Sequence, residues 1–160
     1  MRIRSFVDAD LPVLIDLTVE TFRPLFEDHV RPAYGQELFD LHHGQWDQEY
    51  RDELPGLHDP DTRRWIAVAE VEQVIAGFVA WNSARRPNHG MIYLLAVAAP
   101  YRRGHVGRRL CEHAIAAMKA VGVQVVEVGT GGDAFHAGAR ALYESLGFIK
   151  IEIAGYIQKI

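Results

Sequence analysis

The sequence predicts an α/β (α+β) fold, with a mixed, mostly antiparallel sheet, a parallel central pair of strands and helices on both faces. Two observations lead to it. Residues 65–69 and 74–81 have strong strand patterns and are joined by the polar turn 70–73, which is typical of an antiparallel hairpin. The apolar segments 91–97 and 123–128 flank a stretch with helical spacing, which favours a parallel pair with a right-handed crossover.

The N-terminal region predicts a strand followed by a helix. Residues 2–6 alternate and indicate a short first strand. The next segment has apolar residues at helical spacing, and Pro12 fits its first turn. Pro24 is expected to end or kink this helix, and residues 22–26 are expected to form a bulky loop.

A second helix is predicted over residues 33–54, with a break near Gly44. Asp40, His43 and Asp47 lie at i, i+3 and i+7 and could share one face of it. A metal site is one interpretation of this spacing, and a polar helix face is the other. We favour the polar face, because this spacing is common by chance. No metal is expected.

The rest of the chain alternates between loops, one more helix and two strands. Residues 82–90 are polar and basic and predict a loop before the central strand. Residues 137–146 have helical spacing, and Gly147 is expected to end that helix. The segments 148–153 and 156–160 predict two last strands.

Composition indicates a single domain over residues 1–160 with an ordinary core. Hydrophobic residues make up 49% and charged residues 24%, as in water-soluble globular proteins. The formal net charge of −4 argues against nucleic acid as a partner, because such domains are usually basic. The one cysteine, Cys111, allows no internal disulfide, and we interpret it as a packing residue rather than a nucleophile.

The sequence also predicts a cytoplasmic protein without a membrane partner. Residues 1–10 carry acidic groups and lack the apolar core of a signal peptide. No apolar stretch is long enough to cross a bilayer. A single cysteine fits a reducing compartment.

A basic turn with two glycines, Gly104 and Gly107, follows the strand at 91–97 and opens a helix at Val106. Its four arginines are Arg102, Arg103, Arg108 and Arg109. The first N–H groups of a helix lack partners within it, and the helix dipole adds partial positive charge. The turn therefore predicts an anion site suited to a phosphate or pyrophosphate. An ordinary strand–turn–helix with solvated arginines is the open alternative.

The run L-A-V-A-A-P-Y-R-R-G-H-V-G-R-R-L resembles the acyl-CoA binding motif of the GNAT superfamily of N-acetyltransferases, [RQ]-x-x-G-x-[GA]. Arg102 matches the first position of that motif and Gly107 the last. The middle glycine of the motif falls on His105, and Gly104 stands one residue early. A side chain at this position could crowd the pyrophosphate, or Gly104 could restore the bend.

A second stretch carries the same resemblance. Residues 139–148 read A-R-A-L-Y-E-S-L-G-F, similar to the A-x-x-L-Y-x-x-x-G-F motif of GNAT enzymes. Two motifs in the right order and spacing are more specific than either alone. The resemblance covers roughly residue 65 to the C-terminus and implies acetyl-CoA as the cosubstrate.

The resemblance also implies where acetyl-CoA would lie. The strands at 91–97 and 123–128 would splay apart, and the strand at 91–97 would carry a bulge that frees an N–H group to polarise the thioester carbonyl. The expected binding residues are Leu95, Ala96 and Val97 for the pantetheine, Arg102, Arg103, Gly104, His105, Val106, Gly107 and Arg108 for the pyrophosphate, and His136, where the family usually has asparagine.

Two side chains match family positions for proton transfer. Tyr143 would act as the acid for the leaving CoA thiolate, and Glu127 as the base for the amine. A strand glutamate that faces solvent is the alternative for Glu127. Glu70, His89 and His136 are weaker rivals for the base.

The function implied is direct acetyl transfer to a primary amine, with a small-molecule amine as first choice. Asp133 could pair with a cationic acceptor, or lie in a solvated turn. A protein N-terminus or lysine is the alternative acceptor. A non-catalytic acyl-CoA-binding sensor is the alternative from another class. Nucleotide or nucleic-acid binding is poorly supported, and the resemblance allows a homodimer.

Overall fold

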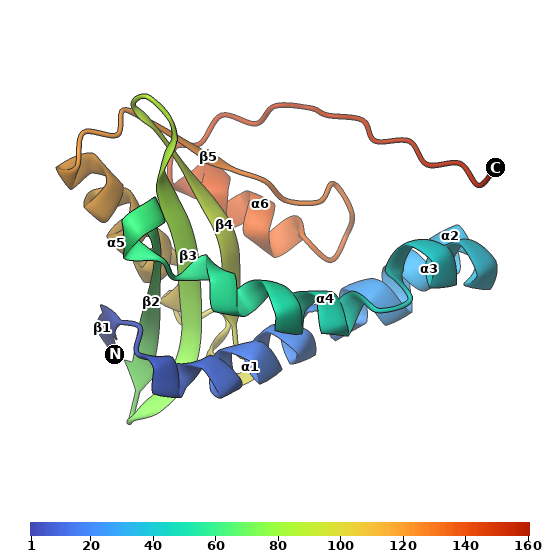
Figure 1. The fold of residues 1–160 in the computed structure, drawn as a ribbon, viewed down its shortest axis with the longest axis horizontal. Coiled ribbons are helices and arrows are strands. Elements are labelled where there is room, and N and C mark those ends of the chain that lie inside the picture. The colour runs from blue at the N-terminus through green and yellow to red at the C-terminus, as the bar shows by residue number, and fades with distance from the viewer.

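The computed structural model contains a five-stranded sheet whose strand order, β1-β2-β3-β4-β5, follows the chain (Figure 1). The structure describes residues 1–83 and 86–160 in full, and residues 84 and 85 by their backbone alone. The strands are β1 (Arg2–Ser5), β2 (Arg64–Val71), β3 (Val74–Arg86), β4 (His89–Val97) and β5 (Val125–Val128). Neighbours from β1 to β4 are antiparallel, and β4 and β5 are parallel. The predicted mixed, mostly antiparallel sheet is confirmed.

Helices cover both faces of the sheet, as predicted (Figure 1). They are α1 (Leu11–Pro24), α2 (Arg31–Tyr34), α3 (Gln36–His43), α4 (Trp46–Glu53), α5 (Val106–Ala120) and α6 (Ala137–Ser145). Helices α1 and α4 lie on one face, and α5 and α6 on the other. Each face therefore buries one side of the alternating strands.

Two apolar clusters hold these layers together. On the α1 face, Leu14 packs with Phe78 of β3. On the α5 face, Leu110 and Met118 pack with Ile92 of β4. Each of these side chains is at most 1% exposed. Burying one such side chain stabilises the fold by about 1.5–3 kcal/mol, so both helix layers are firmly attached to the sheet.

The helical region after β1 differs from the prediction at one point. Pro24 is the last residue of α1, but the chain does not leave the helix there. A π-helical turn at Leu25–Val30 follows and leads into α2. Proline lacks the N–H that an α-helix needs at that position, and the widened turn continues the helix beyond it. The predicted loop at 22–26 is therefore wrong, whereas the predicted break near Gly44 is confirmed between α3 and α4.

In both hairpins the turn is shorter, and the strands are longer, than the sequence predicted. Glu72 and Gln73 have φ of 51° and 67°, as a two-residue turn between twisted strands requires. The predicted loop at 82–90 is wrong, because β3 continues to Arg86, which pairs with His89. Asn88, with φ of 61°, helps to close that turn.

The two predicted C-terminal strands are also wrong, since no residue of 148–160 is assigned to a strand. The segment leaves α6 and runs to α3, where Lys159 forms an ion pair with Glu37 (Figure 1). Its alternating isoleucines, Ile149, Ile151 and Ile153, are 80–90% exposed. Alternation suits a strand, but a strand also needs an edge to pair with, and no pairing between this segment and the sheet is recorded.

Candidate functional site

The pairing between strands β4 and β5 ends halfway along β4. Their parallel pairing runs from His89 opposite Val125 to Ile92 opposite Val128, where β5 ends. Strand β4 continues to Val97. Along this last stretch, the described residues provide no strand on the β5 side, so the edge of β4 is open. An open edge presents unpaired backbone N–H and C=O groups to an extended ligand.

A bulge lies at the same point of β4. Ala80 pairs with Leu94 and the next residue of β3, Trp81, pairs with Ile92, so Tyr93 is an extra residue. Tyr93 is 43% exposed. A bulge in this strand was expected, but sequence reasoning did not single out Tyr93, although a tyrosine hydroxyl within an aliphatic strand is a detectable signal.

The turn after β4 bends at residues other than its glycine. Arg103 and His105 have φ of 65° and 61°, in the left-handed region, whereas Gly104 does not. His105 is the N-cap of α5, and its side chain forms no capping hydrogen bond. The first N–H groups of α5 are therefore left without a side-chain cap. Gly104 does not restore the bend, which falls on His105 itself.

Two of the turn's arginines help to build it. The Nε of Arg102 donates a 3.0 Å hydrogen bond to the Val97 carbonyl at the end of β4. Arg108 donates a 2.7 Å hydrogen bond to the Ser145 hydroxyl and so ties α5 to α6. Arg103 is exposed, and no side-chain bond between it and another described residue is recorded. Arg103 is thus available to an anion at the turn.

Gly107 of α5 packs against α6 and β4. A Cβ atom there would lie 3.4 Å from Leu142 of α6 and 3.7 Å from Leu95 of β4, which is ordinary van der Waals contact. Helix α5 therefore meets both α6 and the open part of β4 at this glycine.

Tyr143 projects from α6 into the α5-side cluster and is 8% exposed. Its ring contacts that of Phe148, with centroids 5.9 Å apart. Burial, together with the nearby Cys111 thiol, raises the pKa of Tyr143 above its usual value. The phenol is therefore protonated at neutral pH, as a proton donor must be.

Cys111 is fully buried, and burial raises its pKa to about 12, which favours packing over nucleophilic chemistry.

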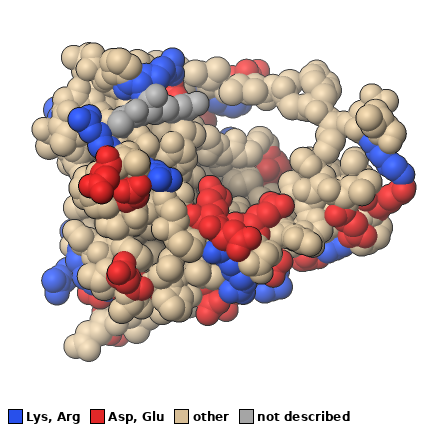
Figure 2. Space-filling view, in the orientation of Figure 1, with Lys and Arg blue, Asp and Glu red and all other residues tan. Residues whose placement is uncertain are grey.

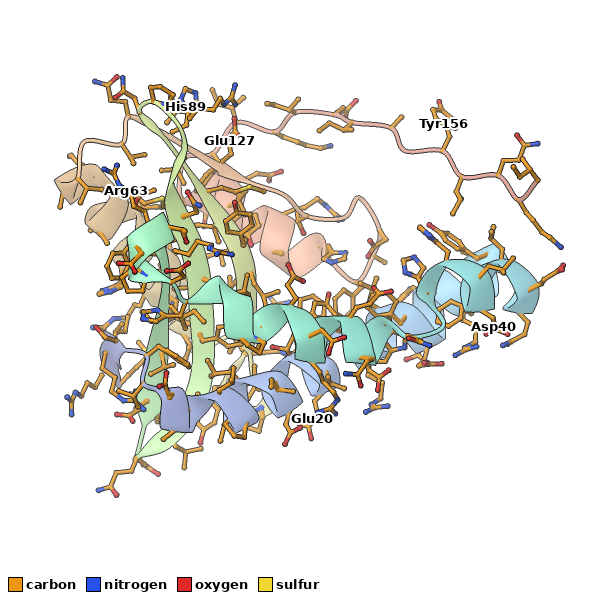
Figure 3. The ribbon with its side chains drawn as sticks, in the orientation of Figure 1. Glu20, Asp40, Arg63, His89, Glu127 and Tyr156 are labelled. Carbon is orange, nitrogen blue, oxygen red and sulfur yellow. The ribbon has the colours of Figure 1, made fainter. Side chains whose placement is uncertain are left out.

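Glu127 lies on β5, opposite Met91 of β4. Its neighbours Val126 and Val128 pack on the α5 side, so Glu127 points toward the α1 face. It is half-buried and accepts a 2.5 Å hydrogen bond from Arg86. Figure 3 shows it close to the β3–β4 turn.

Two other candidate bases, Glu70 and His89, contact groups outside the region where β4 and β5 separate. Glu70 of β2 accepts a 2.8 Å hydrogen bond from Arg4 at the opposite edge of the sheet. His89 begins β4, and its Nδ1 lies 2.8 Å from the Pro87 carbonyl oxygen. Of the predicted bases, Glu127 therefore lies beside the strand pair that opens.

The loop before α6 is held by its own side chains. The Asp133 carboxylate accepts a 3.1 Å hydrogen bond from the backbone N–H of His136 and lies 2.7 Å from its Nδ1. Burial opposes ionisation of Asp133, but these contacts outweigh it and lower its pKa. Arg140 donates 2.6 Å hydrogen bonds to the carbonyls of Gly131 and Asp133. Asp133 is thus engaged with His136 at the start of α6.

An aromatic wall with acidic neighbours stands on the α1 face. The Phe22 ring stacks on that of Tyr50 of α4. Phe135, from the loop before α6, has its ring centroid 6.2 Å from that of Phe22. Burial raises the pKa of Tyr50 to about 12, with a further contribution from the charges of Glu53 and Glu49. Figure 2 shows acidic side chains gathered over α4. Its acidic residues are Asp47, Glu49, Asp52 and Glu53. Aromatic faces and carboxylates together suit a cation.

The structure brings no metal-ligand cluster together among the residues it describes. Asp40 accepts hydrogen bonds from Gln36, and His43 packs against Phe26. Within the same residues, no helix combines the length and the apolar character needed to cross a membrane.

Comparison with known proteins agrees with this arrangement. Residues 19–148 match the Acetyltransferase (GNAT) family. An acetyltransferase of the GNAT family from Staphylococcus aureus has a similar structure, with a TM-score of 0.71 and 16% identity over 94% of this chain and 85% of that one. No curated protein matches the chain.

Two further solved structures were determined with bound molecules. The PaiA N-acetyltransferase from Thermoplasma acidophilum, in complex with coenzyme A, has a TM-score of 0.70 and 15% identity over 96% of this chain and 92% of that one. An aminoglycoside acetyltransferase from an uncultured soil metagenomic sample, in complex with sisomicin, has a TM-score of 0.63. It is 18% identical over 99% of this chain and 95% of that one. At these identities the likeness is one of fold.

Proposed function

Because the chain belongs to the acetyltransferase (GNAT) family, we propose that residues 1–160 act as one domain that transfers an acetyl group from acetyl-CoA to the primary amine of a small molecule. The observation that carries the proposal is that the pairing of β4 with β5 ends at Ile92. It leaves an open, bulged edge that leads directly into the arginine turn of α5.

Acetyl-CoA supplies an activated acetyl thioester. The backbone of Leu95, Ala96 and Val97 would hold the pantetheine along the open edge of β4, as an added strand is held. The N–H groups at the start of α5, with the exposed Arg103, would bind the pyrophosphate. This assignment is supported by the start of α5, which has no side-chain cap.

Two residues would move the protons. Glu127 would take the proton that the amine loses as its nitrogen bonds to the acetyl carbon. Tyr143 would give its phenol proton to the sulfur as the C–S bond breaks. An N–H group freed by the bulge at Tyr93 would stabilise the negative charge that develops on the carbonyl oxygen.

The acceptor side supports a small cationic amine. Tyr50 of the aromatic wall lies near the charges of Glu49 and Glu53 on α4, and the chain carries a net charge of −4. One structure of similar fold was determined with sisomicin bound.

Isothermal titration with acetyl-CoA tests the first half of the proposal. We expect one site with a dissociation constant in the micromolar range. Arg103→Gln should weaken binding about tenfold, since one charge-assisted contact to a phosphate is lost. Arg2→Gln, on β1, is the matched control and should leave binding unchanged. Absence of binding at millimolar acetyl-CoA would mean that His105 closes the turn, and the acetyltransferase function would be rejected.

A panel of acceptors, read by release of the CoA thiol, tests the second half. The panel combines small polyamines and aminoglycosides with peptides that offer a free N-terminus or a lysine. Turnover confined to small amines supports the proposal, and turnover confined to peptides would assign the alternative acceptor. Tight acetyl-CoA binding without turnover on any amine would indicate a sensor.

A further inference from the structure

A second cavity lies on the α5 face of the sheet, away from the arginine turn. Its volume is about 700 Å³, within the range of small-molecule sites. Its floor includes Trp65 of β2 and Trp81 of β3, which stand directly opposite each other. One wall is formed by His113 in the second half of α5 and by Val121 just after that helix. The His113 ring lies edge-on to Trp81, with centroids 6.0 Å apart.

Two hydrogen-bond donors in this cavity have no recorded partner among the described residues. Trp81 is 5% exposed and Ser83 is 9% exposed, yet no hydrogen bond to another described residue is recorded for the indole N–H of Trp81 or the hydroxyl of Ser83. A buried tryptophan N–H usually finds a partner. No sealed polar side-chain atom lacks one among the described residues. These two groups are therefore open to the cavity itself.

The cavity also has a cation, with no carboxylate among the described residues that line it. Arg63 lines it, and Figure 3 shows this residue next to the end of α5. No ion pair is recorded for Arg63 within the described part of the chain. The nearby Asp59 pairs instead with Arg64, at 3.2 Å. An adjoining cavity of about 450 Å³ shares Arg63 and Ser83 and is also free of acidic residues among those described.

This cavity is separate from the acyl-CoA groove. His113 lies seven residues after the start of α5 at Val106, and Val121 lies just past its end. At a rise of about 1.5 Å per residue, the cavity begins roughly 10 Å along the helix from the arginine turn. It also lies over β2 and β3, whereas the groove lies between β4 and β5.

We propose that this cavity binds a planar aromatic acid. The ring would pack against the indoles of Trp65 and Trp81, and the acid group would face Arg63. The Ser83 hydroxyl and the Trp81 N–H would donate to its oxygens. Apolar walls favour the ring, and the excess of donors over acceptors favours an anion over a neutral or cationic ligand.

Indole N–H signals of ¹⁵N-labelled protein provide a direct test with 2-naphthoate as the probe. The chain has three tryptophans. The third, Trp46, donates its N–H to Glu27 at 3.1 Å and serves as an internal control. We expect 2-naphthoate to shift the Trp65 and Trp81 signals and to leave Trp46 unchanged, with assignments from Trp65→Phe and Trp46→Phe. No shift at millimolar 2-naphthoate, or an equal shift of all three signals, would overturn the proposal.

The charge requirement is tested by isothermal titration. We expect 2-naphthoate to bind about tenfold or more tightly than neutral 2-naphthamide, and Arg63→Gln to abolish that difference. Glutamine, like arginine, has a Cβ atom, so the substitution leaves the backbone strain at this position unchanged, where φ is 57°. Arg2→Gln is again the matched control and should preserve the difference. Equal affinity for acid and amide in the unaltered protein would reject the anion site.

Competition with acetyl-CoA locates the probe independently of the proposed activity. Saturating acetyl-CoA should leave the affinity for 2-naphthoate unchanged, because the two sites do not overlap. Competitive displacement would mean that the naphthoate occupies the acyl-CoA groove, and the second site would be rejected.

Discussion

Arg86 donates a 2.5 Å hydrogen bond to Glu127 and so joins the end of β3 to β5. The two residues are 41 positions apart in the chain and meet only because the hairpin at 86–89 brings β3 beside the parallel pair. The predicted base is therefore held by a guanidinium beside the strands that open.

Glu127→Gln should lower kcat for acetyl transfer by about 10²–10³-fold, because the amide cannot accept the amine proton. Acetyl-CoA affinity, measured by titration, should not change, since Glu127 faces the acceptor side. Glu70→Gln is the matched control, and its kcat should stay within about twofold of the unaltered enzyme. A large loss in Glu70→Gln with none in Glu127→Gln would exchange the two assignments.

Tyr143→Phe should lower kcat by about 10²–10⁴-fold while acetyl-CoA still binds, because only the proton donor is lost. Phenylalanine fills the same buried space, so the free energy of unfolding should change by less than about 1.5 kcal/mol. Because burial raises the Tyr143 pKa, the activity of the unaltered enzyme should show no loss from this group below pH 10. Full activity in Tyr143→Phe would show that water protonates the leaving thiolate.

His105→Gly should stabilise the fold by about 0.5–1 kcal/mol, measured by urea unfolding. The left-handed conformation at His105, with φ of 61°, is strained for any residue with a Cβ. Acetyl-CoA should bind the variant at least as tightly as the unaltered protein. Gly122→Ala provides the opposite control: at φ of 86° the added Cβ should destabilise the fold by about 1 kcal/mol. A loss of stability in His105→Gly would mean that the imidazole makes a compensating contact.

Asp10→Asn should destabilise the fold by about 1–3 kcal/mol at pH 7. The Asp10 carboxylate is 8% exposed and accepts hydrogen bonds of 2.7 and 2.8 Å from Arg4. The bond from Arg4 lowers the pKa of Asp10 below its unfolded value of 3.8, although burial opposes this. Its contribution is therefore complete above about pH 4 and is lost as the pH falls through the lowered pKa.

Unfolding experiments between pH 7 and pH 2 check this dependence. Asp10→Asn should flatten the fall in unfolding free energy below pH 4. Asp8→Asn, at an exposed neighbouring site, should follow the unaltered protein. The ion pair would have no role in acid unfolding if the Asp10→Asn and unaltered curves remained parallel.

Local patterns were enough to predict most of the sheet and the helices that cover it. The hairpin β2–β3, the helix α5 and the parallel pair all follow from alternation, helical spacing and short turns within the chain. The C-terminal isoleucines show the limit of this reasoning. Ile149, Ile151 and Ile153 alternate like a strand, but whether a strand forms depends on an edge elsewhere in the fold.

The candidate site divides in the same way. The motifs located the turn at Arg102–Gly107 and the helix of Tyr143, because both are contiguous in sequence. The resemblance implied a bulge in this strand, but its position at Tyr93 could not be predicted, because it is defined by the register with β3. The partnership of Glu127 with Arg86 was hidden for the same reason.

The strand order of the sheet has a consequence for how such a protein can be altered. Because the strands follow chain order, α1 to α4 form one excursion that leaves the sheet after Ser5 and returns at Arg64. The arginine turn, the open edge and α6 all lie later, between His89 and Ser145. The helices of the proposed acceptor side thus come from one segment of the chain, to which the later segment adds Phe135 and Glu127. Replacing residues between Ser5 and Arg64 would therefore change most of the acceptor wall and leave the sequence of the cofactor side as it is.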